Sequence, residues 1–262
     1  EASRKLYFSV SKTMTVAQRL YEQGLLTYMR TDSVNLSVEA KNAAAAQIEK
    51  AFGTTYVKKR SYKGKSKGAQ EAHEAIRPTD FSRQTIEGDR DQIRLYDLIW
   101  KRAIASQMSD AKLERTNVKI AASTHKQLFG ANGEIIVFDG FLKVYLEGND
   151  DEDVEQEGLL PALEVRQPLH SRLISATERF TRPPFRYTEA SLVKKLEELG
   201  IGRPSTYAPT ISTIQNRGYV EKGSTEGLER HYTQLILMSD EMSSKQLKET
   251  VNSDKGKLIP TD

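Results

Sequence analysis

The chain has 262 residues, and its 39 Lys and Arg residues against 36 Asp and Glu give a formal net charge of +3 at pH 7. At roughly 150 residues per domain this length predicts two domains, and a hydrophobic content of 37% supports several modest cores. Because cysteine is absent, a disulfide scaffold, a thiolate metal site and a cysteine nucleophile are excluded, and the sequence has no run of about 18 apolar residues that could span a membrane.

The first third of the chain has the periodicity of helices. Gly24 is predicted to end a first helix, whose apolar face is formed by Met14, Ala17, Leu20 and Tyr21. Ser37 is predicted to cap a second helix that Gly53 closes, so residues 25–33, LLTYMRTDS, connect the two. A third helix is predicted from about Asp89 to Met108, with Ile93, Leu98, Ile99 and Ala103 buried.

Alternation typical of strands begins near residue 113. Asn132-Gly133 lies between two alternating runs and predicts the turn of a β-hairpin. Residues 147–157 hold seven acids and predict a solvated loop. Residues 113–178 are therefore predicted to form a β-rich section of antiparallel strands.

Helices are predicted again after the proline-broken segment 179–184. Thr188 starts one helix, and Ser205 caps a second one that Gly218 ends. Residues 219–235 then suit a wing hairpin, so helix, tight glycine turn, helix and hairpin form a helix-turn-helix pattern. About twenty residues at the end of the chain are charged and weakly patterned.

These segments predict a multi-domain chain that is mainly α with a β-rich connecting domain. The predicted domains are a helical domain at residues 1–112, a partial β-rich connecting domain at 113–178 and a partial helical domain at 179–262. The helix-turn-helix-like element belongs to the last of them.

Tyr28 and Arg30 lie on the predicted connection between the first two helices, where a side chain can project away from the core. A phenol is a weak nucleophile at neutral pH unless it is activated. A guanidinium two residues away could hold a phosphate beside the phenol and stabilise charge in a transition state. From spacing alone, a surface tyrosine packed on a turn beside a solvated arginine is the commoner arrangement.

Two further features suit phosphate binding. His73 could donate a hydrogen bond to a phosphate oxygen or shuttle a proton, although a hydrogen-bonded structural histidine is the commoner role. The predicted helix N-terminus after GIGRP combines free N–H groups with Arg203, Ser205 and Thr206, and Arg217 lies on the same helix. An ordinary capped helix is the alternative there.

No metal or nucleotide site is predicted. Arg77 occupies the second histidine position of an HExxH motif, and four scattered His without Cys do not suit zinc. Lys59 stands where a phosphate loop at KGKSKG requires Gly, and the acids of 147–157 lack the spacing of a calcium loop. The basic loop at residues 58–67 suits contacts to nucleic-acid phosphates or plain solvation.

Several segments together resemble one family. They are GLLTYMRTDS, EAHEAIRPTDF, LIWKRAIASQMSDA and FTRPPFRYTEASLVKKLEELGIGRPSTYAPTISTIQNRGYV. Over roughly residues 3–220, in the family's order, they resemble the type IA DNA topoisomerases of bacteria. The resemblance implies an isomerase that relaxes negatively supercoiled DNA without ATP.

The resemblance also implies residue roles. Tyr28 matches the nucleophile, which attacks a phosphodiester of a single strand, forms a 5′-phosphotyrosine intermediate and frees a 3′-hydroxyl. The intact strand passes through the break, and the hydroxyl then reseals it. Arg30 matches an arginine that contacts the scissile phosphate, and His73 matches a histidine near the cleavage site.

The resemblance also implies which residues bind DNA. Arg203 and Arg217 match positions that bind the single strand, with Ser205 and Thr206 beside Arg203 at the helix start. The helical domain at 1–112 would then carry the nucleophile, and the domain at 179–262 would be a DNA-binding base.

The resemblance further implies Mg²⁺ in the intact protein, bound by clustered acids of a first domain that has no counterpart among the residues before Tyr28. We therefore expect an internal fragment that also lacks the family's C-terminal tail, that binds no metal itself and that is inactive in relaxation alone. Expected partners are single-stranded DNA and, through the intact protein, negatively supercoiled duplex DNA, with no membrane. A monomer in the cytoplasm, associated with the nucleoid, is expected.

Other interpretations stay open. A tyrosine recombinase or type IB enzyme also combines Tyr, Arg and His but makes a 3′-phosphotyrosine link, and the order of Tyr28 before HxxxR argues against it. A non-catalytic winged-helix module would read duplex DNA through residues 205–217, yet that helix offers mostly Thr, Ile and Ser. A purely structural role is the third possibility.

Overall fold

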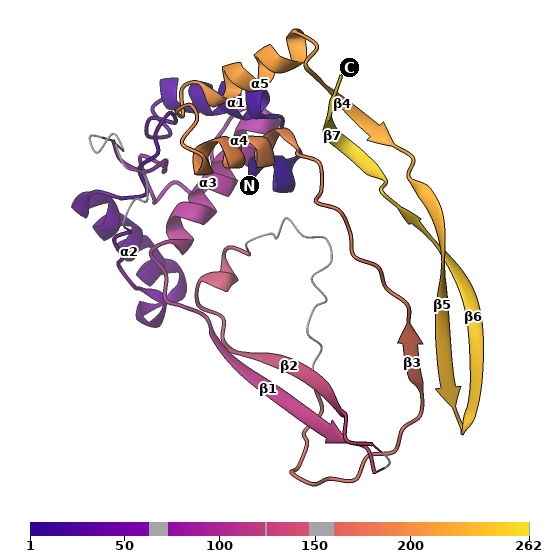
Figure 1. The fold of residues 1–262 in the computed structure, drawn as a ribbon. Coiled ribbons are helices and arrows are strands. Elements are labelled where there is room, and N and C mark those ends of the chain that lie inside the picture. Colours follow the sequence, from indigo (N-terminus) through magenta and orange to yellow (C-terminus); the bar gives the residue numbers. More distant parts are fainter. Residues whose placement is uncertain (63–72, 124, 147–159, 262) are drawn as a thin grey trace. The chain divides into compact units, whose positions relative to one another are not determined.

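The computed structural model of the protein describes residues 1–62, 73–123, 125–146 and 160–261. The predicted acidic loop at 147–157 and the KGKSKG part of the predicted basic loop lie outside these ranges. The chain divides into two compact units, Glu1–Ala162 with Gly200–Ala208 and Leu163–Leu199 with Pro209–Asp262, whose elements are shown in Figure 1. Helices make up 32% and strands 27% of the described residues, so the fold mixes helices with antiparallel sheets and is less helical than the predicted mainly α chain.

Three α-helices form the helical part of the first unit. They are α1 (Val10–Glu22), α2 (Val38–Phe52) and α3 (Arg90–Ala105), with the short helical turns η1 (Ala2–Leu6), η2 (Thr54–Tyr56) and η3 (Gly140–Lys143). The Ser37 hydroxyl caps α2, and Gly53 ends it at φ +97°, a conformation that suits glycine. Asp89 and Gln92 form a capping box at the start of α3. The predicted bounds of these helices are confirmed to within a few residues.

The core of the first unit lies among these helices. Its largest fully buried side chains include Leu20, Leu26, Ile48, Phe81, Tyr96, Trp100, Ile104 and Met108. Leu98 and Ala103 are buried as predicted, but Ile93 is 40% exposed. The buried face of α3 instead follows Leu95, Tyr96, Trp100 and Ala103 at helical spacing, and Ile93 lies off that face.

Strands β1 (Lys112–Ala121) and β2 (Leu128–Phe138) form an antiparallel hairpin. The pairing of Ala121 with Leu128 closes it, whereas Asn132 and Gly133 pair in the middle of β2, so the prediction of a turn at Asn132-Gly133 is wrong. A Cβ atom on Gly133 would lie 2.6 Å from Cγ of Leu160. The glycine is therefore required by close packing and not by a turn.

The second unit is richer in strands than the sequence predicted. Its elements are β3 (Ile174–Thr177), α4 (Glu189–Glu198), most of α5 (Tyr207–Asn216), β4 (Val220–Thr225), β5 (Leu228–Met238), β6 (Glu241–Val251) and β7 (Asp254–Pro260). Thr188 caps α4, and Gly218 follows α5 at φ +68°, both as predicted. The weakly patterned last residues contribute to β6 and β7, so the section 179–262 is not mainly helical.

Two of the three strand pairings described in this unit join strands that are distant in the sequence, and β5 with β6 forms a hairpin. One antiparallel sheet has the order β3-β5-β6, and a second pairs β4 with β7. The predicted wing hairpin at 219–235 is therefore wrong, because β4 and β5 pair with different partners. Leu258 of β7 is buried, and its N–H donates to the Tyr187 carbonyl, 2.7 Å away, so a segment outside the β4–β7 sheet also holds β7 in place.

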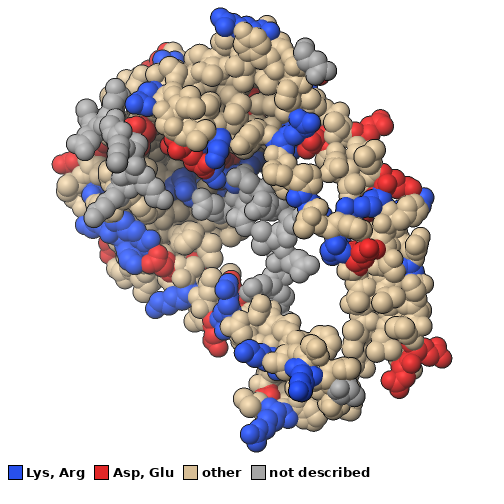
Figure 2. Space-filling model, in the orientation of Figure 1, with Lys and Arg blue, Asp and Glu red and all other residues tan. Residues whose placement is uncertain are grey.

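Basic and acidic side chains are interspersed over the face drawn in Figure 2. This mixture agrees with the small formal net charge of +3. Recognition of a polyanion must therefore be argued from local groups of side chains and not from the charge of the whole chain. Among the described residues, none of the helices is both long enough and apolar enough to cross a bilayer.

Candidate active site

Two extended segments that are 50 positions apart in the sequence lie side by side in the first unit. Leu26 forms an antiparallel bridge with Pro78. The Thr27 N–H donates to the Arg77 carbonyl, and the Arg77 N–H donates to Thr27 Oγ1, each over 2.9 Å. Backbone pairing thus joins the segment of the candidate tyrosine to the segment of the candidate histidine.

The ring of Tyr28 is half-buried beside two other rings. Its centroid lies 5.3 Å from that of Tyr21 in an edge-to-face arrangement, and 5.5 Å from that of His73 at a tilt of 41°. Such aromatic contacts restrict the ring in addition to the area they bury. The structure therefore brings Tyr28 and His73 together, as the sequence interpretation required but could not establish.

Arg30 follows Tyr28 by two residues in the sequence. The preceding Met29 is buried with 6% exposure, whereas the Arg30 side chain is exposed. Its guanidinium forms no hydrogen bond or ion pair with another described residue, so it can accept an anionic ligand without breaking an internal contact.

Glu74 ties the histidine segment to α2. Its Oε1 accepts a hydrogen bond from the Ser37 N–H, and its Oε2 accepts from the Arg77 guanidinium over 2.5 and 3.0 Å. Partial burial opposes ionisation of Glu74, but the hydrogen bonds from Ser37 and Arg77 outweigh it and hold the pKa of the carboxyl below its usual value. Glu74 and Arg77 are therefore supports of the site, and Ser37 has two roles, as cap and as donor.

We expect the Glu74→Gln substitution to destabilise the first unit by about 1–2 kcal/mol at neutral pH. Because the pKa of Glu74 is lowered on folding, its charge stabilises the fold above the unfolded-state pKa, and this contribution is lost as pH falls through the folded-state value. Urea unfolding of both proteins between pH 7 and pH 3 should therefore show their difference shrinking with acid. A difference that stays constant with pH would contradict the assigned role of the charge.

Helix α3 holds the chain that follows the histidine segment. The Trp100 Nε1–H donates to the Phe81 carbonyl over 3.0 Å, and the Tyr96 hydroxyl donates to the Arg83 carbonyl over 2.6 Å. Burial raises the pKa of the Tyr96 phenol, which keeps this donor protonated. Two buried aromatic donors of α3 thus hold Phe81 and Arg83, which follow the histidine segment.

The other predicted DNA-binding residues are exposed around α5. The Thr206 hydroxyl accepts from the Arg203 N–H over 2.9 Å and donates to the Arg203 carbonyl over 3.1 Å. The predicted cap at Ser205 is wrong, because Thr206 orders this turn and the Ser205 hydroxyl bonds to none of the described residues. Arg217 follows the other end of α5 in the second unit, so no geometry joins it to Tyr28.

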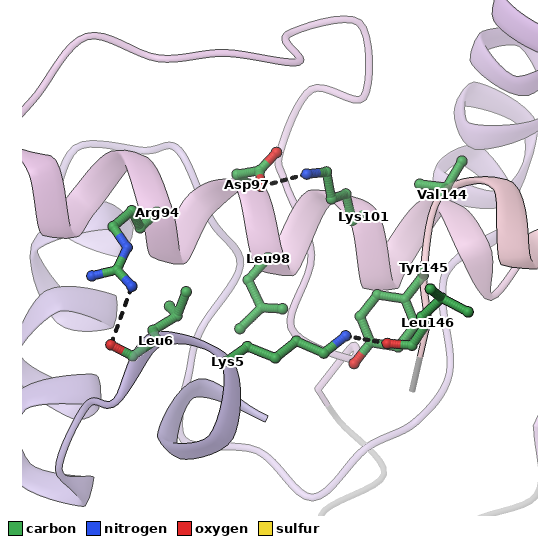
Figure 3. A pocket seen from close by; sticks show the side chains of 9 residues that line it. All are labelled: Lys5, Leu6, Arg94, Asp97, Leu98, Lys101, Val144, Tyr145 and Leu146. Atoms are coloured by element: carbon green, nitrogen blue, oxygen red, sulfur yellow. Dashed lines mark hydrogen bonds and ion pairs between the residues drawn. The ribbon is translucent and has the colours of Figure 1, made fainter. Parts of the chain in front are cut away.

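Within the described ranges, no group of three or more His, Cys, Asp or Glu side chains could hold a metal ion. A depression of about 470 Å³ lies against α3, and Figure 3 shows Lys5, Arg94 and Lys101 around the side chains of Leu98 and Tyr145. The depression is lined by residues that do not include the tyrosine. Its cations are engaged, Arg94 by the Leu6 carbonyl and Lys101 by Asp97. The depression is thus not the predicted site.

Sequence reasoning missed two parts of the tyrosine environment. Tyr21 was assigned to the apolar face of a helix, yet it is 42% exposed and contacts Tyr28 across the turn at Gly24. Thr27 was not singled out, although its hydroxyl also donates to the Ala75 carbonyl over 2.9 Å. No periodicity marks either role, because both depend on which distant segment the connection pairs with.

Comparison with known proteins gives a consistent result. The family model described as DNA topoisomerase matches residues 1–233. The chain is 50% identical over 227 residues to DNA topoisomerase 1 of Zymomonas mobilis, which covers 84% of this chain and 19% of that protein. It is 52% identical over 236 residues to DNA topoisomerase 1 of Streptomyces coelicolor, covering 86% and 25%.

A solved structure agrees. Full-length topoisomerase I from Thermotoga maritima superposes with a TM-score of 0.65 at 41% identity, over 85% of this chain and 37% of that one. The chain spans well under half the length of each of these proteins. The family model nevertheless covers most of the chain, and the motifs around Tyr28 and His73 lie inside the match. The chain therefore belongs to the DNA topoisomerase family.

Proposed function

We propose that this chain supplies the nucleophile-bearing and strand-binding part of a type IA topoisomerase that relaxes negatively supercoiled DNA. The observation that carries the proposal is the contact of the Tyr28 ring with His73, and the exposed Arg30 follows Tyr28 by two residues. The membership of the family supports DNA as the partner. The pairing of the two motif segments supports a preformed site, because the tyrosine does not depend on a mobile loop for its position.

The proposed reaction is a transesterification. The Tyr28 Oη attacks the phosphorus of one strand, the bond to the 3′-oxygen breaks, and a 5′-phosphotyrosine link forms. The phenolic proton leaves during attack, and the departing 3′-oxygen takes up a proton. Because one phosphodiester replaces another, the bond energy is conserved and the 3′-hydroxyl can reseal the strand after passage without ATP.

His73 and Arg30 have separate tasks in this proposal. His73, in contact with the Tyr28 ring, would shuttle the proton or donate to a phosphate oxygen. Arg30 would hold the phosphate and stabilise the charge that develops on it. Within the described residues the acids do not form a cluster that fits Mg²⁺, which the intact enzyme is proposed to bind elsewhere.

Strand binding is proposed to involve the exposed residues Arg203, Ser205, Thr206 and Arg217. The partners would be single-stranded DNA for this chain and negatively supercoiled duplex DNA for the intact enzyme, acting as a monomer in the nucleoid. A winged-helix module that reads duplex DNA is less well supported, because the strand after α5 pairs with β7 and not with β5 as a wing would.

Binding of a labelled oligonucleotide of about 16 nucleotides, single-stranded or as its duplex, tests the proposal at two salt concentrations. We expect salt-sensitive binding that favours the single strand, and weaker binding after Arg203→Ala or Arg217→Ala. Lys50→Ala, which removes an exposed cation at the end of α2, is the matched control. Preference for the duplex would favour the winged-helix module. The same preparation should not relax a supercoiled plasmid, and robust relaxation would show that this chain is catalytically complete.

A further inference from the structure

Residues 179–187 form a run in which arginines alternate with aromatic residues. The sequence RFTRPPFRY holds three arginines, three aromatic residues and no acid. All nine residues are exposed, and the exposed fractions of the rings are 41% for Phe180, 57% for Phe185 and 43% for Tyr187. Single exposed rings are common on proteins, but three on one acid-free run indicate a surface that serves a ligand.

Both ends of this run are held by strands of the second unit. At one end Glu178 exchanges two hydrogen bonds of 2.9 Å with the backbone of Thr233 in β5. At the other end the Tyr187 carbonyl accepts from the Leu258 N–H of β7. Pro183 and Pro184 restrict φ between these anchors. The rings are therefore presented on a stiff, extended backbone that loses little entropy on binding.

Cations from the same strands face the two phenylalanine rings. The guanidinium of Arg230 in β5 lies 4.0 Å from the centre of the Phe180 ring, and Nζ of Lys257 in β7 lies 5.6 Å from the centre of the Phe185 ring. Arg230 also pairs with Glu249 over 2.5 Å, which fixes the guanidinium plane beside the ring. Each phenylalanine thus has a cation on its surface and remains open to solvent.

Acids offset only part of this charge. Arg186 pairs with Asp254 over 3.7 Å, and both side chains belong to the second unit. Neither Arg179 nor Lys257 forms an ion pair with another residue that the structure describes. Phosphate groups could therefore bind to the cations of the run without breaking all of their ion pairs with acids.

We propose that residues 179–187, together with Arg230 and Lys257, form an additional contact track for single-stranded DNA. The proposal rests on the function proposed above and adds contacts apart from residues 203–217. A single strand offers bases that stack on aromatic rings and guanidinium planes, and phosphates that bind the arginines. A duplex keeps its bases stacked inside, and an acidic peptide would use the cations but leave the rings without partners. Interleaved rings and cations therefore favour the single strand.

Part of this track lies outside the matched region. Arg179 to Tyr187 and Arg230 fall within the family match, but Lys257 lies beyond its last residue, Thr233. The cation facing Phe185 is thus supplied by a strand beyond the residues that the family model matches.

The test measures anisotropy of a fluorescein-labelled oligo-dT with the whole chain. We expect the double variant Phe180→Ala and Phe185→Ala to weaken binding by about tenfold or more at every salt concentration, with an unchanged salt slope, since stacking carries no counterion release. Replacing both with Tyr should retain binding. Arg179→Gln with Arg182→Gln should instead reduce the salt slope. Phe129→Ala, a half-exposed phenylalanine of β2, is the matched control.

The outcomes separate this proposal from the function on which it rests. If the chain binds the single strand and Arg203→Ala weakens it, but the double phenylalanine variant binds normally with unchanged circular dichroism, the track is refuted and the function stands. If polyglutamate of equal length competes as well as oligo-dT, the surface recognises acidic chains and the track is also refuted. If the chain binds no single-stranded DNA, both proposals fail.

Discussion

Replacing Tyr28 with Phe in the full-length enzyme is expected to abolish formation of the covalent protein–DNA complex, with a loss of at least about a thousandfold in cleavage. The substitution removes only Oη, so the ring keeps its contacts with Tyr21 and His73. Binding of single-stranded DNA should therefore stay within about twofold of the unmodified enzyme, because a single hydrogen bond to a neutral group adds little net affinity.

The measurement is a denaturing gel of an oligonucleotide labelled at either end. With a 5′-phosphotyrosine link, only the label on the 3′ side of the break should remain with the protein. Tyr21→Phe is the matched control, since it removes a neighbouring hydroxyl and leaves the edge-to-face contact with Tyr28. Residual cleavage by the Tyr28→Phe enzyme would refute the nucleophile assignment. Retention of the other label would point to the 3′ linkage of the tyrosine recombinases.

Helix positions could be predicted because their signals are local. Ser37, Asp89 and Thr188 each accept a hydrogen bond from a backbone N–H within three residues, and Gly53 and Gly218 leave the helices at positive φ. Such contacts need no distant partner. The residues that form them are neighbours in the sequence, so helix ends can be predicted without knowing the tertiary structure.

Strand pairing could not be predicted in the same way. The sequence predicted a wing hairpin over residues 219–235, but nothing in it says that β7, about thirty residues after Val220–Thr225, is the neighbour of that strand. Asn132-Gly133 has the composition of a tight turn, yet the packing of Leu160 decides its place in mid-strand. In both cases a tertiary contact outweighs a local preference.

The candidate site falls between these cases. Tyr28 and His73 could be named from the family resemblance, but their contact depends on the pairing of Leu26 with Pro78. That pairing leaves no periodic signal, since each segment contributes only one bridge residue. The supporting roles of Thr27 and Glu74 follow from it and became visible only in the structure.

The dependence of the site on α3 leads to the second large expected effect. Trp100 is 1% exposed, and its indole N–H is the donor to the Phe81 carbonyl. Trp100→Ala should cost about 3–5 kcal/mol, because it leaves a cavity in the core and a buried carbonyl without its donor. Trp100→Phe keeps most of the ring volume and should cost about 1–3 kcal/mol. Both variants remove the only tryptophan of the chain, so tryptophan fluorescence cannot follow their unfolding. Urea unfolding is therefore followed by circular dichroism.

Ile93→Ala is the matched control on the same helix, because Ile93 is 40% exposed and its loss should change stability by about 0.5 kcal/mol. Phe81 lies three residues after Pro78, which pairs with Leu26, so loss of the indole should also loosen the contact between Tyr28 and His73. In the full-length enzyme, Trp100→Ala should therefore reduce cleavage at temperatures where circular dichroism still shows a folded protein. Normal cleavage with a large loss of stability would show that the site keeps its geometry without this support from α3.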